Sequence, residues 1–275
     1  MKVAAVQMDI KILEKEQNLE HILETLNQAA RAGAKLVVFP ECALTGYCFN
    51  GMDEAMPMAE TIPGPSTARL AEAARKHDCT IIVGMLERED ERLYNAAAVI
   101  APGGVLGSHR KAHLPCLGID WCTTPGDQPL RVFHTPHGKI GVNICYDVSI
   151  PEAARVLKLK GAQLLAVPTN WPMGSDTWEH TPNVRATENH FCVVAADRVG
   201  EERGSRFAGH SKIVDSAGTV LAEAGATEET ILYADLDLAA ADQNRVVRIP
   251  GKWEYDRIAT RRPDLYGAIT EPKRK

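Results

Sequence analysis

The chain has 275 residues, 45% of them hydrophobic and 24% charged, with a formal net charge of −5, so it is globular and has no electrostatic attraction to nucleic acid or to an anionic membrane. Its seven cysteines form no CxxC pair, which argues against a disulfide framework and a zinc ribbon. Because no apolar stretch reaches membrane-spanning length and the N-terminus lacks a signal-peptide core, the expected compartment is the reducing cytoplasm.

The first half of the chain alternates between predicted strands and helices. Strands are predicted at Val3–Met8, Leu36–Phe39, Thr80–Leu86 and Ala96–Ile100, and helices at Asn18–Ala32 and Thr67–His77. Gly33 is placed to end the first helix, and Ser66 to N-cap the second. The second strand is apolar throughout, which is typical of a strand buried on both faces.

The second half repeats this pattern. It predicts a hairpin of Leu130–His134 and Lys139–Cys145, helices at Ser149–Lys160 and Pro182–His190, and strands at Leu164–Val167, Cys192–Ala196, Ser211–Asp215, Val220–Ala222 and Thr230–Leu236. Strands alternating with helices indicate an α/β fold, and consecutive strands without a helix make its sheets mixed. The likeness of the halves indicates two sheets related by a pseudo-twofold axis, each covered by helices.

We expect a single domain over residues 1–275, since no low-complexity linker interrupts the chain. Residues 249–275 carry Trp253, Tyr255 and Tyr266 without strong periodicity. They are expected to pack as a C-terminal arm, on their own chain or on a neighbour.

Cys145 lies where a predicted strand turns sharply into a predicted helix. Ser149 and Glu152 have the form of a capping box, and Pro151 is tolerated in a first helical turn. Backbone N–H groups at such a turn favour an anion, whether a thiolate or a developing oxyanion. Since free cysteine is also among the most buried residue types, this stretch alone fits a nucleophile and a core residue about equally.

Other polar residues follow predicted strands, and in α/β sheets function collects at the carboxyl ends of strands. Glu41 follows Leu36–Phe39, and Lys111 follows the region around Val99–Ser108. A carboxylate can take the thiol proton and later give it to a leaving amine. A lysine can hold an oxyanion and lower the thiol pKa from its free value of about 8.5. Either residue alone also fits a cap or a surface charge.

A Cys–His pair is a second possibility from composition. The sequence has nine histidines, of which His109, His113 and His190 are the nearest candidates. None of them lies in a motif that requires such a pair.

Three motifs resemble the signatures of the nitrilase superfamily of carbon–nitrogen hydrolases. They are Glu41 in FPECALTGY, Lys111 in HRKAHLP and Cys145 in NICYD, in the family's order and at similar spacings. Flanking segments such as PTNWP, RATEN and RRPDLYG extend the resemblance over nearly the whole chain. It implies a four-layer α-β-β-α sandwich, a Glu41–Lys111–Cys145 triad, no metal and no organic cofactor. It also implies a homodimer or higher homo-oligomer, with C-terminal arms often crossing between subunits.

One position departs from the family pattern. Many members carry a second glutamate eleven residues after the catalytic lysine, and here Cys122 stands at that place. The nearest carboxylate is Asp120. We expect Asp120 to position the substrate or Lys111, the alternative being a loop residue that makes a turn.

The resemblance implies hydrolysis of a non-peptide C–N bond in a small linear amide or N-carbamoyl compound. Cys145, deprotonated by Glu41, would form a thioester with release of ammonia or amine, while Lys111 and the backbone N–H of Tyr146 hold the oxyanion. Water activated by Glu41 would then hydrolyse the thioester. The expected pocket walls are Tyr47, Tyr146, Asn170 and Trp171.

Three alternatives remain from the sequence. Conversion of a nitrile to a carboxylic acid and ammonia uses the same triad, although NICYD and PTNWP resemble the amidase and carbamoylase branches more. A non-catalytic binding protein predicts a damaged triad. A thiol-redox protein predicts a second cysteine near Cys145, for which Cys42 is a candidate. Substrate choice is expected from three loops, Gly46–Pro63, Leu114–Gly126 and Trp171–His180. In the last of them, Asp176, Glu179 and His180 either read a charged substrate end or are solvated.

Overall fold

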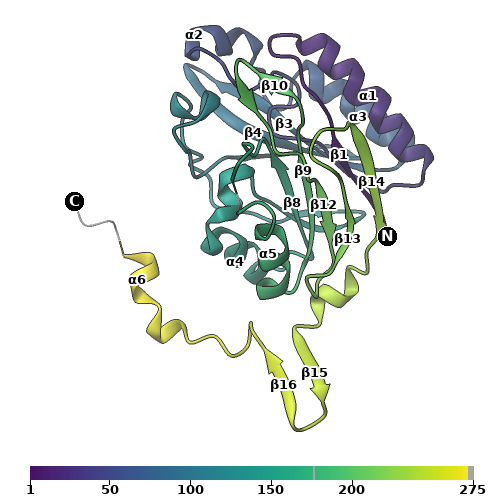
Figure 1. Ribbon diagram of the computed structural model, residues 1–275, viewed down its shortest axis with the longest axis vertical. Helices are drawn as coiled ribbons and strands as arrows, with labels where there is room; N and C mark the ends of the chain where they lie inside the picture. Colours follow the sequence, from purple (N-terminus) through teal and green to yellow (C-terminus); the bar gives the residue numbers. More distant parts are fainter. Residues whose placement is uncertain (176, 272–275) are drawn as a thin grey trace.

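The structure is a computed structural model that describes residues 1–175 and 177–271, so Asp176 lies outside the described residues. Two six-stranded sheets form its body (Figure 1). The first sheet has the order β14-β1-β2-β3-β4-β5, with β1 (Lys2–Gln7), β2 (Leu36–Val38), β3 (Thr80–Glu89), β4 (Arg92–Ala101), β5 (Gly104–Arg110) and β14 (Thr230–Asp235). The second has the order β13-β12-β9-β8-β7-β6, with β6 (Phe133–Thr135), β7 (Gly138–Val142), β8 (Leu164–Thr169), β9 (Cys192–Asp197), β12 (Lys212–Val214) and β13 (Val220–Glu223).

The two sheets repeat one pairing pattern. In the first, β14 is antiparallel to β1, β1 to β3 are parallel, and β4 and β5 follow antiparallel. In the second, β6 is antiparallel to β7, β7 to β9 are parallel, and β12 and β13 follow antiparallel. The parallel crossovers carry α1 (Lys15–Arg31) and α3 (Pro65–His77) in one half, and α4 (Pro151–Leu159) and α5 (Thr181–Asn189) in the other. This repeat confirms the predicted pair of related mixed sheets.

The sheets pack face to face, with helices on their outer faces. Alternate residues of β1 point to opposite sides, so Val3 joins the core that the two sheets share, and Val6 joins the core under α1. The shared core includes Val142 and Val194 of the second sheet, and α4 and α5 cover that sheet's other face (Figure 1). The four layers are those of the expected α-β-β-α sandwich.

Two predicted helix caps are wrong. Ser66 lies inside α3, whose N-cap is Gly64, because the Ser66 hydroxyl donates to Glu60 Oε1 at 2.8 Å instead of capping. Ser149 ends a short 3-10 helix, η3 (Cys145–Ser149), and α4 begins at Pro151 without a side-chain cap. Pro151 does occupy the first turn, as predicted.

The structure contains one strand that was not predicted, and it distributes the last three predicted strands over two sheets. Strand β5, which leads directly to Lys111, was not predicted. The last three predicted strands do not lie in one sheet, because β14 leaves β12 and β13 and pairs with β1. The short elements not yet named are α2 (Met52–Ala55), η1 (Met56–Met58), η2 (Gly118–Trp121), η4 (Ala239–Asp242) and the hairpin of β10 (Glu201–Glu202) and β11 (Ser205–Arg206).

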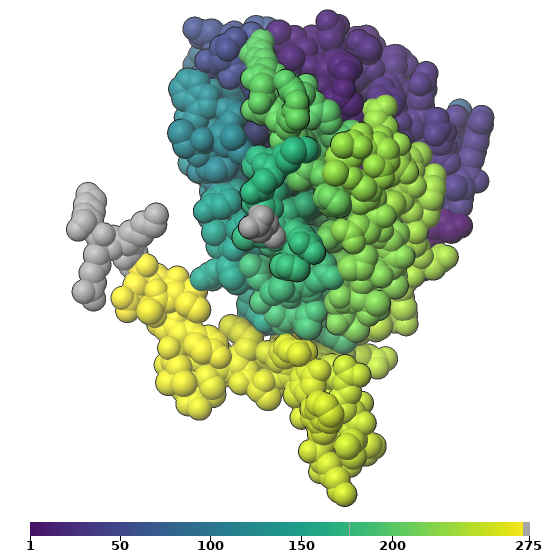
Figure 2. Space-filling model, in the orientation of Figure 1, coloured from purple at the N-terminus to yellow at the C-terminus, as the bar shows by residue number. Residues whose placement is uncertain are grey.

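The C-terminal segment leaves the body of the molecule. It begins with a hairpin of β15 (Arg245–Ile249) and β16 (Trp253–Asp256), followed by η5 (Pro263–Leu265) and α6 (Gly267–Thr270). Figure 1 and Figure 2 show this segment, coloured yellow, extending outside the sandwich. It starts at Arg245, four residues before the predicted boundary. Among the described residues, no helix has the length and apolar character needed to cross a membrane.

Candidate active site

Glu41 stands in the turn that follows β2, where its carboxylate is fully buried. The turn packs directly on β3, since the Phe39 N–H donates to the Ile82 carbonyl at 2.9 Å. This packing requires glycine at position 84, because a Cβ there would lie 2.4 Å from the Pro40 carbonyl oxygen and 2.5 Å from the Glu41 Cα. A tight backbone approach therefore fixes the position of the carboxylate.

Lys111 joins two buried carboxylates. Its Nζ lies 2.7 Å from Glu41 Oε1 and 2.5 Å from Asp120 Oδ2, and all three side chains are inaccessible to solvent. The Lys111 backbone continues the edge of the first sheet, with its N–H donating to the Asn95 carbonyl at 2.8 Å. Asp120 comes from η2, so three separate segments meet at one ammonium group.

Two further side chains complete this network. Asn95 of β4 donates through Nδ2 to Glu41 Oε1 at 2.6 Å and to Asp120 Oδ1 at 2.8 Å. The Tyr47 hydroxyl donates to Asp120 Oδ2 at 2.7 Å, so this expected pocket residue contacts the network directly. Asn95 was missed by the sequence analysis, although a polar residue in the apolar stretch LYNAAAVI was a signal for it.

Cys145 begins η3, just after β7 ends. It is 3% exposed and has a left-handed φ of +45°, a strained conformation for a residue with a Cβ. Asp147 closes the turn, because its Oδ2 accepts the Ile144 N–H at 3.1 Å. Thr169 and the backbone of Asn170, in the segment where β8 ends, act to lower the pKa of the thiol, but by less than burial raises it.

Burial sets the protonation of the thiol. It raises the pKa of Cys145, Glu41 raises it further, and the opposing effect of Lys111 does not compensate. Lys111 does lower the thiol pKa, as expected, but desolvation of the thiolate outweighs the charge of the lysine, so the pKa rises overall. The thiol is protonated at rest and needs a base.

The pKa values of Glu41 and Lys111 are both raised above their ordinary values. Burial raises the pKa of Glu41, against the lowering effect of Lys111, which makes the carboxylate a better proton acceptor. Burial disfavours the charged form of Lys111, but Glu41, Cys145 and Asp120 outweigh it and raise its pKa well above the ordinary value. Lys111 is therefore a permanent cation in the site.

The other predicted pocket residues divide into buried and exposed. The Asn170 N–H donates to Glu41 Oε2 at 2.9 Å, and its side-chain amide is buried with no partner among the described residues. The Trp171 N–H donates to Asp197 Oδ1 at 2.9 Å, and its ring stacks on Trp178 with centroids 5.1 Å apart. The Tyr146 side chain is 41% exposed.

Two of the three histidines considered as partners of Cys145 bind a carboxylate instead of the thiol. His109 Nε2 lies 2.9 Å from Asp147 Oδ2, and His113 Nδ1 lies 2.7 Å from Asp147 Oδ1. Asp147 also accepts the backbone N–H groups of Ala112 and His113. It thereby ties the segment after Lys111 to the turn of Cys145, a role the sequence analysis missed.

A cavity of about 410 Å³ lies next to this network. Tyr47 forms part of its wall, together with Leu117 and Met173 and with the β10–β11 hairpin. Over residues 1–175 and 177–271, no cluster of three or more His, Cys, Asp or Glu side chains is arranged to hold a metal ion.

A buried carboxylate, lysine and thiol at strand ends of an α-β-β-α sandwich define a hydrolase that works through a cysteine. The chain belongs to the carbon–nitrogen hydrolase family, whose model matches residues 2–245. It is 40% identical over 250 residues to a nitrilase of Pyrococcus abyssi (strain GE5 / Orsay), covering 90% of this chain and 93% of that protein. It is 37% identical over 250 residues to omega-amidase NIT2 of Mus musculus, covering 86% and 88%.

Solved structures agree with this membership. A carbon–nitrogen hydrolase from Helicobacter pylori G27 superposes with a TM-score of 0.88 at 27% identity, covering 99% of this chain and 98% of that one. An amidase from Nesterenkonia sp. AN1, with acrylamide added at its active-site cysteine, superposes with a TM-score of 0.79 at 26% identity, covering 98% and 99%. The chain is a cysteine-dependent carbon–nitrogen hydrolase, which confirms the predicted reaction class over the non-catalytic and thiol-redox alternatives.

Proposed function

We propose that the chain hydrolyses a small linear amide or N-carbamoyl compound, with Cys145 as nucleophile, Glu41 as acid–base and Lys111 as oxyanion holder. The observation that carries this proposal is the buried Lys111, which is fixed between Glu41 and Asp120. The charges of Glu41 and Lys111 shift the pKa of the Cys145 thiol, and those of Lys111 and Asp120 shift the pKa of Glu41. A fixed cation beside a protonated nucleophile and a carboxylate supplies the parts of an acyl transfer.

Acylation begins with a protonated thiol. As the sulfur of Cys145 attacks the carbonyl carbon, the S–H bond breaks and its proton passes to Glu41. The carbonyl oxygen becomes an oxyanion, which Lys111 and the backbone N–H of Tyr146 stabilise. Lys111 is held by Glu41 and Asp120 before the reaction, so little reorganisation accompanies the development of charge.

The intermediate then collapses to a thioester. Its C–N bond breaks, and Glu41 returns the proton to the leaving nitrogen, which departs as ammonia or amine. A water molecule, deprotonated by Glu41, attacks the thioester carbon. The acid product leaves, and the proton held by Glu41 returns to the sulfur of Cys145.

Asp120 is proposed to take the place of the glutamate that many relatives carry. Its Oδ2 binds the same Lys111 ammonium as Glu41 Oε1, and the carboxylate is itself fixed by Tyr47 and Asn95. Because two anions share the ammonium, Lys111 is held in one orientation. We assign Asp120 to positioning Lys111, one of the two roles considered from the sequence.

Substrate contacts are proposed for Tyr47, Asn170 and Trp171. The unpartnered Asn170 amide can donate to a carbonyl and accept from an N–H, the two groups of a carboxamide. Tyr146, with its exposed side chain, is proposed to contribute chiefly its backbone N–H. Glu179 and His180 are both exposed, which favours the solvated alternative for them.

Nitrile hydrolysis is the second candidate, supported by the similarity to the Pyrococcus abyssi nitrilase. The same thiol would attack the nitrile carbon. The similarity to omega-amidase NIT2 and to the Nesterenkonia amidase favours the amide.

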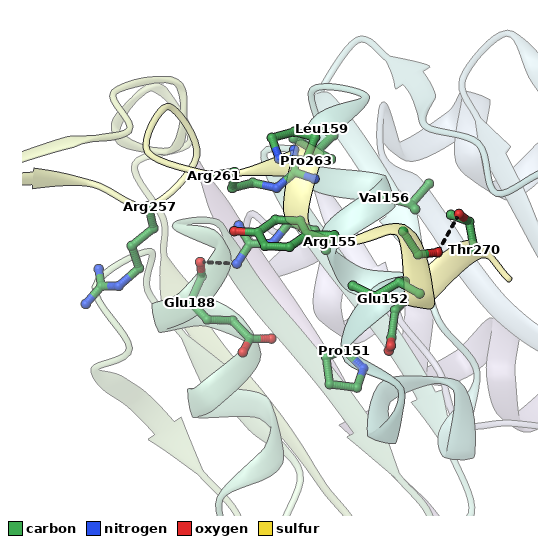
Figure 3. Close-up of a pocket in the computed structure, with 13 residues that line it drawn as sticks. Pro151, Glu152, Arg155, Val156, Leu159, Glu188, Arg257, Arg261, Pro263 and Thr270 are labelled. Atoms are coloured by element: carbon green, nitrogen blue, oxygen red, sulfur yellow. Dashed lines mark hydrogen bonds between the residues drawn. The ribbon is translucent and has the colours of Figure 1, made fainter.

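A homodimer or higher oligomer in a reducing cytoplasm remains our proposal for the working protein. Figure 3 shows side chains of the C-terminal arm, such as Arg261 and Pro263, beside Arg155 and Val156 of α4. The cavity that these residues line has a volume of about 560 Å³. Apolar side chains stay exposed on both elements, among them Val156 and Leu159 of α4 and Leu265 and Ile269 of the arm. A second copy of the chain would bury them. Light scattering of the purified protein tests this assembly.

The function is tested with a panel of amides, ureido acids and nitriles, following ammonia, with Cys145→Ala as control. Ammonia from wild type and none from the variant is the expected result, and the preferred compound separates amidase, carbamoylase and nitrilase. Equal release by both proteins contradicts the nucleophile. No release by wild type, combined with a slowly alkylated Cys145, contradicts the proposed function.

A further inference from the structure

We propose that Asn95 is a positioning residue that occupies one oxygen of Glu41, so that the proton taken from Cys145 is carried on the other oxygen, Oε2. This inference rests on the proposed role of Glu41 as acid–base. It assigns the reaction's proton to a single atom and gives a function to a side chain outside the three sequence motifs.

The orientation of the Asn95 amide is fixed from both ends. Its Nδ2 lies 2.6 Å from Glu41 Oε1 and 2.8 Å from Asp120 Oδ1. A flipped amide would place its oxygen against two carboxylate oxygens, which have no proton to offer. On the opposite side, the Cys42 thiol donates to Asn95 Oδ1 at 3.6 Å.

The Cys42 thiol keeps the proton that this contact needs. Cys42 is fully buried, and burial raises the pKa of its thiol well above the ordinary value. Cys42 therefore acts as a permanent donor to Asn95, and the two amide hydrogens are left for Glu41 and Asp120.

The Glu41 carboxylate uses three of its four in-plane lone pairs in hydrogen bonds to the described residues. Oε1 accepts from Asn95 Nδ2 at 2.6 Å and from Lys111 Nζ at 2.7 Å, so both of its in-plane lone pairs are used. Oε2 accepts only the backbone N–H of Asn170, at 2.9 Å, among the described residues. One lone pair of Glu41 is free, and it lies on Oε2.

The proton path follows from this count. When sulfur attacks, the S–H bond of Cys145 breaks and an O–H bond forms at Oε2. The same O–H then breaks to deliver the proton to the leaving nitrogen. Because Oε1 stays bound to Asn95 and Lys111 throughout, the carboxylate plane does not rotate between the two transfers.

The test combines three variants with two readouts. Asn95→Ala removes both donated hydrogen bonds, Asn95→Asp keeps the shape but replaces the donor by an oxygen, and Tyr94→Phe is the control. Tyr94 is the buried neighbour in β4, and its hydroxyl has no partner among the described residues. The readouts are the pH profile of turnover and the pH profile of Cys145 alkylation by acrylamide, followed on the tryptic peptide of residues 140–155, which contains no other cysteine.

Asn95→Ala is expected to lower kcat about 10- to 100-fold with little change in KM, the effect of losing a hydrogen bond to a charged group. The acid limb of both profiles should move to higher pH, because the hydrogen bond from Asn95 lowers the pKa of Glu41. Asn95→Asp should lose more than Asn95→Ala, and Tyr94→Phe should match wild type. A fall in turnover with both acid limbs unmoved, or an equal fall in Tyr94→Phe, overturns the proposal.

A second pair covers the case in which Asn95→Ala does not fold. Cys42→Ala removes the donor to the amide oxygen of Asn95 and should move the acid limb of the alkylation profile to higher pH, by less than Asn95→Ala does. Cys42→Ser keeps a donor at this position and should move the acid limb less than Cys42→Ala does. Equal profiles for the pair overturn the proposal. Since alkylation needs no substrate, these outcomes stand apart from the ammonia assay, whose failure would concern the proposed function.

Discussion

Nζ of Lys111 lies 2.5 Å from Oδ2 of Asp120, and both side chains are completely buried. The partner stands only nine residues further along the chain, in the turn of η2. A buried cation needs its counterions, because removing one of them leaves an uncompensated charge in the protein interior. The pair therefore links the folding of the 111–120 loop to the placement of Lys111, the proposed oxyanion holder.

Asp120→Asn removes one of the two counterions of Lys111. We expect kcat/KM to fall about 10- to 100-fold, the cost of losing a charge-assisted hydrogen bond. Because Asp120 raises the pKa of Glu41, the acid limb of the pH profile should move to lower pH, opposite to Asn95→Ala. Steady-state kinetics across pH measure both effects, with the exposed Asp127→Asn as control. Unchanged turnover in Asp120→Asn would show that Asp120 only forms the loop.

Lys111→Met leaves Glu41 and Asp120 facing each other without a cation. Turnover should fall about 100- to 1,000-fold, as for loss of an oxyanion donor. Since Lys111 lowers the pKa of Glu41, that pKa should rise further above its unfolded value of about 4.3. A carboxyl group with a raised folded pKa contributes stability at low pH that is lost as pH rises through that pKa.

The variant should therefore lose more stability, relative to wild type, at pH 8 than at pH 5. Thermal unfolding at the two pH values measures this, and Lys139→Met, which alters a partly exposed lysine, is the matched control. A stability loss that is equal at both pH values would mean that Glu41 does not depend on Lys111 for its charge.

The sequence predicted the fold class and most strands, because apolar periodicity and short apolar runs mark both faces of each sheet. It missed β5, Gly104–Arg110, whose residues GVLGSHR are half-buried at a sheet edge and carry little apolar signal. It also grouped Thr230–Leu236 with the strands before it. The pairing of β14 with β1 joins two strands that lie far apart in the sequence, and no local pattern encodes such a contact.

The three motif residues were predicted, and so was the nearby Asp120, but the partners that fix them were not. Asn95 binds Glu41, which lies 54 residues away in the sequence, and Asp147 binds His109, which lies 38 residues away. Their roles depend on which strands become neighbours. The net rise of the Cys145 pKa was also out of reach, since it depends on burial, which the strand-end position alone does not determine.

Gly84→Ala tests the packing under Glu41. Its Cβ would lie 2.4 Å from the Pro40 carbonyl oxygen and the Cys42 amide nitrogen, so β3 and the turn must separate. We expect a loss of about 1–3 kcal/mol in the free energy of unfolding, together with a larger relative loss of turnover, because the carboxylate moves with the turn. Chemical denaturation and kinetics measure the two.

Gly103→Ala is the matched control for Gly84→Ala, because a Cβ at position 103 meets nothing within 4 Å. It should leave both quantities close to wild type. If Gly84→Ala kept full turnover while losing stability, the position of Glu41 would not depend on this contact.

His113→Asn tests the link between Asp147 and the lysine segment. The hydrogen bond that His113 donates to the Asp147 carboxylate raises the pKa of His113 above its ordinary 6.5, against the opposing effect of burial. A histidine with a raised folded pKa contributes stability that is fully present below its unfolded pKa and is lost as pH rises through the folded value. Wild type should therefore exceed His113→Asn in thermal stability most at pH 6, and the difference should shrink by pH 8.5. Thermal unfolding scans across this pH range measure the difference, with His134→Asn, at an exposed position, as control. A difference that stayed constant with pH would mean that His113 binds Asp147 only as a neutral ring.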